Sequence, residues 1–327
     1  MKFTLTNFVL EFKTPFSIAH GTRNGTDLVF LKIEDEGIIA YGEASLPPYL
    51  PETTQTVHSF INSFLDKNND FSIGLSSVLD KLINFAPGNF SAKACIDIAL
   101  HNYFAKKSGS TIQQLLGLKS EIMPLCTFTI GMDDAEGIKN KVAEATDFKL
   151  LKIKLGGKND RQIISAIREV TNKPLCVDVN QGWGNEKEMA LKMIEWLKEQ
   201  DVIFVEQPLI KSDVEGQKWL HERSPLPIIA DEAAQVPEDI ELIKNFYDGV
   251  NVKLMKCGGI GEGMKMIKAI RNNGMKVLIG SMTESGCAIS AAASLASLAD
   301  WVDLDGPLLT KNNPFDIVNY YDGKIVI

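Results

Sequence analysis

The chain has 327 residues, 45% of them apolar and 23% charged, as in globular proteins that bury a large core. Its formal net charge of -8 argues against nucleic acids and anionic membranes as partners. No apolar run approaches the roughly 20 residues of a membrane span, and the amino terminus lacks a signal peptide's features, so we expect a cytoplasmic protein.

Residues 1–45 predict a three-stranded meander, with strands over residues 2–12, 27–35 and 38–44. The first two strands are separated by a polar segment that is too long for a tight hairpin. We interpret the stretch near residues 15–27 as a lid that sets substrate specificity, the alternative being a solvated connection without a role.

Three helical patterns follow the meander, over residues 53–67, 76–85 and 91–109. Together with the meander they predict an α+β capping domain over residues 1–120. The last 22 residues, 306–327, are rich in turns and end in a short strand, which we expect to return to this domain.

Short apolar runs, most of them ending in a charged residue, recur every 21 to 29 residues from residue 150 to residue 305. This period suits a buried strand, a loop and an amphipathic helix, and continuous rather than alternating apolar runs are typical of parallel sheets. Another run over residues 124–132 makes eight. The sequence therefore predicts a (β/α)8-type barrel over residues 121–305, with its active site at the carboxyl ends of the strands.

Three carboxylates, Asp178, Glu206 and Asp231, close three consecutive strands of this barrel. Neighbouring strand ends share one mouth, so these anions would repel each other strongly without a cation. Oxygen ligands without cysteine or histidine favour Mg²⁺, ahead of Mn²⁺ or Ca²⁺. The scattered cysteines and histidines suggest neither a disulfide framework nor a zinc site.

Lys154 and Lys253 lie on strands to either side of the three carboxylates. Two opposed amines could remove a proton from one face of a substrate carbon and return it to the other, provided that a lowered pKa makes lysine a base. Lys152 shares the face of Lys154 and, with the metal ion, would favour the neutral amine. The alternative is that the lysines only balance the carboxylates.

The strand ends carry five short motifs: the KxK of residues 152–154, DVNQGW at 178–183, VEQP at 205–208, ADE at 230–232 and KLMKCGG from residue 253. Together these motifs resemble the muconate-lactonizing subgroup of the enolase superfamily. The resemblance covers essentially the whole chain and implies a modified (β/α)7β barrel with an α+β capping domain completed by the carboxyl-terminal tail.

The resemblance also implies a reaction. One Mg²⁺ per subunit, with Mn²⁺ as a substitute, would be held by Asp178, Glu206 and Asp231 and would stabilise an enediolate. The two lysines, Lys154 and Lys253, would transfer the proton, with Lys152 beside them.

The Asp303-Leu304-Asp305 sequence at the end of the eighth strand is similar to one that binds the substrate ammonium in dipeptide epimerases. Two carboxylates on one face, away from the metal, suit such a cation, although they could also cap the last loop. The implied substrate is a dipeptide whose carboxyl-terminal Cα is epimerised. Thr129, Ser281 and Met282 are expected to line its pocket.

The segment near residues 15–27 bears on the choice of dipeptide. In L-Ala-D/L-Glu epimerases, which it resembles, a basic residue stands where this chain has Gly21, and Arg23 lies two residues further on. The segment instead offers Phe16 and Ile18. We therefore expect a neutral or hydrophobic dipeptide rather than an acidic one.

Other functions stay open at this point. Within the superfamily they are an N-acylamino acid racemase, an o-succinylbenzoate synthase and a muconate cycloisomerase, whose substrates lack the free amine that Asp303 and Asp305 would bind. Outside it are a Schiff-base aldolase that uses one strand-end lysine and a metal-binding protein without catalysis. The resemblance also allows a homo-oligomer.

Overall fold

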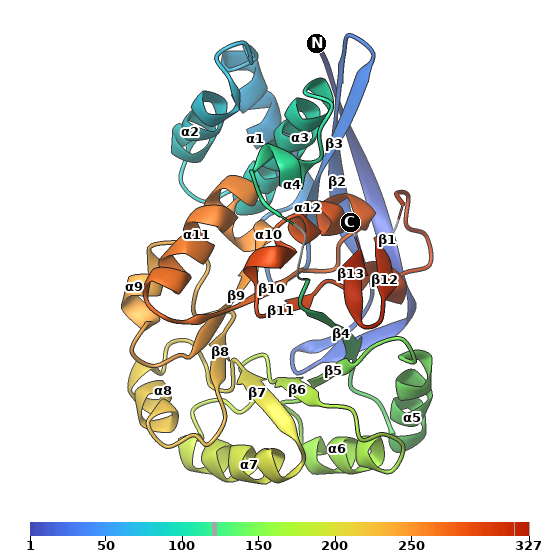
Figure 1. Cartoon of the computed structure of the whole chain (residues 1–327), viewed down its shortest axis with the longest axis vertical. Helices are drawn as coiled ribbons and strands as arrows, with labels where there is room; N and C mark the ends of the chain where they lie inside the picture. The colour runs from blue at the N-terminus through green and yellow to red at the C-terminus, as the bar shows by residue number, and fades with distance from the viewer. Residues whose placement is uncertain (120–122, 317, 327) are drawn as a thin grey trace.

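The computed structural model describes residues 1–119, 123–316 and 318–326. A capping domain with most of the amino-terminal elements sits on one end of a strand-and-helix barrel (Figure 1). The predicted domain boundary between residues 120 and 121, and residue 327 of the predicted last strand, lie outside the described residues.

The capping domain begins with an antiparallel sheet in the order β1-β2-β3, as the alternating pattern predicted. Its strands are β1 (Lys2–Ile18), β2 (Gly21–Asp35) and β3 (Ile38–Leu46). Glu36 and Gly37, with φ values of 48° and 84°, form the turn between β2 and β3. Such left-handed pairs match the twist of tight hairpins.

The predicted long loop between the first two strands was wrong. β1 and β2 continue to pair as far as Ile18 and Gly21, which leaves only two residues at the tip of the hairpin. The register shifts between Glu11 and Phe16, where the four residues 12–15 stand opposite a single residue of β2. This bulge absorbs the surplus residues, so the polar segment could remain a hairpin.

Helices cover one face of the sheet. They are α1 (Thr54–Lys67), α2 (Leu75–Phe85), α3 (Phe90–Lys107) and the short α4 (Ile112–Leu115). The middle of α3 packs so closely on β3 that a Cβ at Gly42 would lie 1.8 Å from the Cys95 carbonyl oxygen. Glycine is therefore required at this contact between sheet and helix.

Eight parallel strands form the barrel, which closes by pairing of the first with the last. They are β4 (Leu125–Ile130), β5 (Leu150–Lys154), β6 (Leu175–Asp178), β7 (Val202–Glu206), β8 (Ile228–Ala230), β9 (Gly249–Lys253), β10 (Lys276–Gly280) and β11 (Trp301–Asp303). The predicted eight-stranded barrel is confirmed.

Helices connect consecutive strands around the outside of the barrel (Figure 1). They are α5 (Ala135–Glu144), α6 (Asp160–Arg168), α7 (Lys187–Glu199), α8 (Val214–His221), α9 (Asp239–Ile243), α10 (Leu254–Cys257), α11 (Ile260–Asn272) and α12 (Gly286–Ala293). After β11, residues 306–309 form a 3-10 turn, and no α-helix follows in the described part of the chain. The architecture is therefore (β/α)7β, as the resemblance implied.

A small apolar cluster fills the barrel interior near the amino ends of the strands. It consists of buried Leu150, Cys176, Phe204, Ile229 and Leu278. Because strand side chains alternate, the residues two positions further along each of these strands point into the same interior. The apolar cluster therefore forms a floor beneath the polar side chains at the carboxyl ends.

The tail contacts both domains. Phe315 packs against Phe30 and Tyr41 of the capping sheet, with ring centroids 5.0 and 5.1 Å away. The hairpin of β12 (Asn319–Tyr321) and β13 (Lys324–Val326) then pairs with β4 of the barrel. No helix in the described ranges is both long and apolar enough to cross a membrane.

Candidate active site

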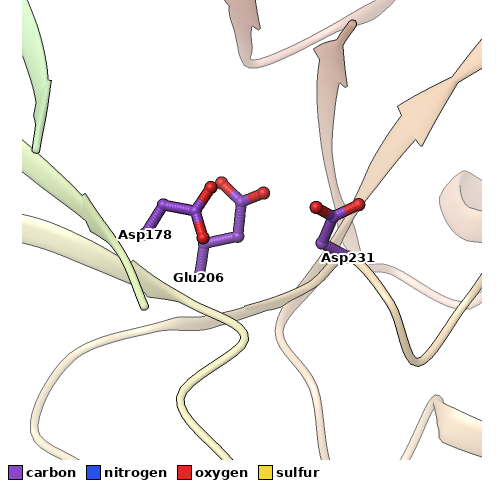
Figure 2. A group of neighbouring side chains, drawn as sticks. All are labelled: Asp178, Glu206 and Asp231. Atoms are coloured by element: carbon purple, nitrogen blue, oxygen red, sulfur yellow. The ribbon is translucent and has the colours of Figure 1, made fainter. Parts of the chain in front are cut away.

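The three predicted metal ligands lie together at the carboxyl ends of neighbouring strands. Asp178 and Glu206 end β6 and β7 in paired register, and Asp231 follows β8 directly. All three are buried, and one oxygen from each lies within 4.8 Å of the others. Figure 2 shows their carboxylates gathered at these strand ends.

This arrangement fits a hard divalent cation. The three side chains offer only carboxylate oxygens, the donors that Mg²⁺ prefers. Burial raises the pKa of Glu206 to about 7, and the charge of Asp178 adds to the effect. Such mutual repulsion among buried anions is what a bound cation relieves.

The two predicted acid–base lysines flank the carboxylates. Lys154 Nζ lies 2.6 Å from Asp178 Oδ2, and Lys253 Nζ lies 2.8 Å from Asp231 Oδ2. Their strands, β5 and β9, stand on opposite sides of the ligand-bearing strands. The amines therefore approach the cluster from two sides, as predicted from the order of the strands.

The carboxylates around Lys253 determine the direction of its pKa shift. Burial lowers this pKa, but the charges of Asp231 and Glu206 outweigh burial and raise it above its ordinary value. These carboxylates therefore favour the ammonium form of Lys253. A cation shared by the same carboxylates would weaken the shift, because it competes for their charge.

Lys152 lies below the cavity rather than on its wall. Its Nζ is 2.6 Å from Asp303 Oδ2, 2.7 Å from Glu206 Oε2 and 3.2 Å from Asp178 Oδ2. Burial lowers the pKa of Lys152, yet the three carboxylates raise it well above its usual value. This buried lysine links the cluster of three carboxylates to the last barrel strand.

Lys256 fixes the loop that carries Asp231. Its Nζ donates to Asp231 Oδ1 at 2.6 Å and to the backbone carbonyls of Asp231, Ala234 and Asn251 at 2.7, 3.1 and 2.9 Å. Burial raises the pKa of Asp231, but Lys253 and Lys256 hold it well below its usual range. The position of the Asp231 carboxylate thus depends on Lys256.

Asp303 and Asp305 meet Thr129 at the other side of the mouth. Thr129 donates its backbone N–H to Asp305 Oδ2 at 2.6 Å, and its hydroxyl lies 3.2 Å from Asp303 Oδ1 and 3.1 Å from Asp305 Oδ1. Burial raises the pKa of Asp303, but the charge of Lys152 reverses this and brings it to about 2. Burial and the charge of Asp303 raise the pKa of Asp305 to about 7.

A cavity of about 370 Å³ opens above these groups. Many of the predicted site residues line it: Phe16, Ile18, Arg23, Thr129, Lys154, Asp231, Lys253, Ser281, Met282, Asp303 and Asp305. Gly21 does not line the cavity, and a Cβ added there would meet nothing within 4 Å. Asp178, Glu206 and Lys152 lie deeper.

Sequence reasoning missed several lining residues. Phe12 and Tyr49 come from the capping domain and Leu309 from the turn after the last barrel strand. Thr127, which donates to Asp303 Oδ1 at 2.8 Å, was also missed. Of these residues, only Thr127 could have been predicted from the sequence, because it stands two residues before Thr129 and therefore lies on the same face of the strand.

The tip of the β1–β2 hairpin, interpreted from the sequence as a specificity lid, is packed against the barrel. Met132 N donates to Ser17 O at 3.1 Å. A Cβ at Gly131 would lie 3.1 Å from the Phe16 ring, and one at Gly156 would lie 3.0 Å from Ala19 Cβ. In Figure 1 the hairpin runs from the capping domain to the strands β4 and β5. The hairpin thus forms a docked wall of the cavity.

Comparison with known protein families agrees with this architecture. Residues 2–117 match the mandelate racemase/muconate lactonizing enzyme amino-terminal domain, and residues 135–305 match the enolase carboxyl-terminal domain-like family. The chain belongs to the enolase superfamily. The resemblance seen in its motifs is therefore confirmed.

Relatives of known activity cover nearly the whole chain. An L-Ala-D/L-Glu epimerase of Bacteroides thetaiotaomicron is 40% identical over 100% of this chain and 85% of its own length. An L-Ala-D/L-amino acid epimerase of Pedosphaera parvula is 36% identical over 94% of this chain and 90% of its own.

A solved structure of another protein is also similar to this chain. It is a dipeptide epimerase from Enterococcus faecalis V583 in complex with Mg and the dipeptide L-Leu-L-Tyr. Its TM-score is 0.88, with 28% identity over 99% of this chain and 95% of the other. The chain is an isomerase of the epimerase type.

Proposed function

We propose that this protein is a Mg²⁺-dependent dipeptide epimerase that inverts the Cα of the carboxyl-terminal residue. The observation that carries the proposal is the arrangement of three groups around one cavity. Two lysines flank a cluster of metal-binding carboxylates, and a second pair of carboxylates lies at the far side of the mouth. The names of the similar epimerases support the same reaction.

Lys154 and Lys253 move the proton in this proposal. One Nζ takes the proton from Cα, and the opposite Nζ delivers a proton to the other face, so that the configuration inverts. Each amine lies within 2.8 Å of a different carboxylate of the cluster. Those carboxylates orient the two amines toward a substrate held between them.

Asp178, Glu206 and Asp231 would hold the Mg²⁺. When bound there, the ion supplies positive charge that stabilises the negative charge developing on the substrate carboxylate as the α-proton leaves. Lys152, buried beside Asp178 and Glu206, adds a fixed positive charge to the same site. The apolar floor below keeps water away, which strengthens these charge interactions.

Asp303 and Asp305 would bind the ammonium of the dipeptide. Lys152 already neutralises Asp303 at 2.6 Å, whereas Asp305 receives only hydrogen bonds from Thr129 among the described contacts. A substrate ammonium would supply the positive charge that the pair still needs. N-acylated and muconate-type substrates lack this cation, which favours a dipeptide.

The cavity wall suggests a neutral or hydrophobic residue at the reacting position. Phe12 and Phe16 stack with ring centroids 5.3 Å apart, and Ile18, Met282 and Leu309 extend the same apolar lining. Arg23 also lines the cavity, but its guanidinium lies over the Tyr49 ring, 5.3 Å from the centroid. The Arg23 guanidinium has no carboxylate partner among the described ion pairs, so it could bind an acidic side chain of the substrate. An acidic dipeptide is therefore the second candidate.

A dipeptide library in D₂O with Mg²⁺ tests the proposal. Mass spectrometry should detect a one-dalton gain in dipeptides with a hydrophobic second residue, and EDTA should abolish it. Exchange confined to X-Glu dipeptides would assign the side-chain contact to Arg23, and Arg23→Met should then abolish the preference. Exchange only in N-acylamino acids, or in no substrate, would refute dipeptide epimerisation.

Single lysine variants test the two-base scheme. Lys154→Ala and Lys253→Ala should each lower epimerisation by about 10²–10⁴-fold, because each removes one acid–base group. Each variant should still exchange the α-proton of one substrate enantiomer with solvent. Lys198→Ala, which removes an exposed lysine on α7, is the control. Full activity in either active-site variant would contradict the scheme, and borohydride trapping with a ketone would point to an aldolase.

A further inference from the structure

Two buried carboxylates of the capping domain reach into the barrel and cap its helices. Glu43 of β3 accepts hydrogen bonds from the backbone N–H groups of Ser285 at 2.8 Å and Ala288 at 3.1 Å, at the start of α12. Asp97 of α3 does the same at the start of α11, with Ile260 N at 2.7 Å and Gly261 N at 3.1 Å. Carboxylates suit these positions because helix amino termini carry partial positive charge.

Glu43 and Asp97 differ in whether the backbone segment that they bind contacts the cavity. The segment 281–285 that leads into α12 supplies three residues to the cavity wall, Ser281, Met282 and Thr283. The first residues of α11 do not line that cavity. Glu43 therefore holds a segment that contacts the cavity, and Asp97 holds one that does not.

The capping domain makes further contacts with the segment 281–285. The Ser285 hydroxyl lies 2.5 Å from Glu43 Oε2, and the Ser45 hydroxyl donates to Thr283 O at 2.6 Å. Tyr49 OH lies 3.2 Å from Met282 Sδ. The wall is thus formed by barrel residues whose position depends on contacts with strand β3 and the residues after it.

This segment follows β10, which pairs with β9 on one side and β11 on the other. Lys253 ends β9, and Asp303 ends β11. A dipeptide that spans from Lys253 to Asp303 and Asp305 would lie beside the segment 281–285, because this segment follows the strand between theirs. The wall therefore lies beside the part of the substrate between the reacting Cα and the amino end.

We propose that Glu43 is a positioning residue for substrate recognition, which sets the wall 281–285 against the amino-terminal residue of the dipeptide. The proposal rests on the proposed function. Without Glu43, three donors would be left without their buried acceptor, and the segment would have to shift to find water. Displacements of about 1 Å near bound substrate are enough to change rates by large factors.

Kinetics of Glu43→Ala and Asp97→Ala, with dipeptides that vary in the first residue, test this inference. Both variants remove a buried carboxylate that joins the domains, so both should lower the unfolding midpoint. Glu43→Ala should also raise KM by about tenfold or more and change the ranking of first residues, with a smaller effect on kcat. Asp97→Ala should keep the wild-type KM and ranking.

Two milder variants keep the test decisive if Glu43→Ala does not fold. Glu43→Gln retains one accepting oxygen and should restore part of the wild-type KM. Ser45→Ala removes only the hydrogen bond to Thr283 O and should raise KM in the same direction.

The outcomes separate the two proposals. A wild-type protein that exchanges no dipeptide would refute the proposed function, and this inference with it. A wild-type protein that exchanges dipeptides, with the same KM and ranking in the Glu43, Ser45 and Asp97 variants, would refute the positioning role alone.

Discussion

Replacement of Glu284 by glutamine should make the free energy of unfolding fall less steeply as pH rises. Glu284 is buried on the segment between β10 and α12, where its Oε1 accepts a hydrogen bond from Met282 N at 2.7 Å. Burial, followed by the charge of Glu43, raises its pKa from 4.5 to about 8. Between these values the folded chain binds a proton at this site that the unfolded chain has lost.

The sign and size of the effect follow from this difference. Because the folded state holds the extra proton, the free energy of unfolding falls as pH rises through the window. One proton gives a slope of about 1.4 kcal/mol per pH unit, so about 4 kcal/mol at most is lost between pH 5 and pH 8. Glutamine is neutral at every pH and keeps the accepting oxygen. The variant should therefore match the wild type near pH 5 and exceed it near pH 8.

Urea unfolding followed by circular dichroism at about pH 5, 6.5 and 8 measures the difference. EDTA in every sample keeps metal binding from contributing its own pH dependence. Glu199→Gln, at an exposed position on α7, is the control and should leave the slope unchanged. A stability difference between Glu284→Gln and the wild type that is constant with pH would refute the reasoning.

Three further variants test other parts of the structure. Asp178→Asn should weaken Mg²⁺ binding by about tenfold or more in calorimetric titration, and an unchanged Kd would place the ion elsewhere. Trp183→Phe removes the donor that meets Asp160 Oδ2 at 2.8 Å and should cost about 1–3 kcal/mol in urea unfolding, unless water replaces the bond. Gly42→Ala would set a Cβ 1.8 Å from Cys95 O and should cost about 1–3 kcal/mol or more, so an unchanged Tm would contradict this close packing.

The barrel and its strand-end residues could be predicted because both depend on a local, repeated pattern. Each buried strand is a short apolar run, and its last inward position carries the functional group, as at Lys154 and Asp178. Closure of the barrel then brings these ends to one mouth without further information. The grouping of Asp178, Glu206 and Asp231 within 4.8 Å follows from that geometry.

The cavity wall supplied by the capping domain and the turn after β11 could not be predicted in this way. Phe12, Tyr49 and Leu309 reach the mouth only through the packing of the capping domain and tail on the barrel. Glu43 and Ser285 are separated by 242 positions, and no periodicity relates them. Contacts of this kind depend on how two domains dock, which a pattern within either domain does not encode.

The β1–β2 hairpin shows a second reason why part of the fold could not be predicted from the sequence. Pro15 and the glycines and threonines near Arg23 are typical of loops, and they led to the prediction of a long loop. The β-bulge between Glu11 and Phe16 accommodates Pro15, and the glycines and threonines near Arg23 pair with β1 as part of β2. The tip then packs on Gly131 and Gly156. Local composition was outweighed by contacts with the barrel, which the sequence of the hairpin alone does not contain.

The division between the two domains has a consequence for how substrate preference can vary. The groups to which we assign proton transfer and metal binding are held by one another and by Lys152 and Lys256, all from the barrel. The walls are held by the hairpin and by Glu43 and Ser45 of the capping domain. Ser45 also donates its backbone N–H to Met255 Sδ at 3.4 Å, in α10 directly after Lys253, so this one cap residue contacts both the wall and the lysine-bearing segment. Under the proposed function, variants of Glu43, which does not contact α10 among the described hydrogen bonds, should combine with variants of Lys154 with nearly additive effects on kcat/KM.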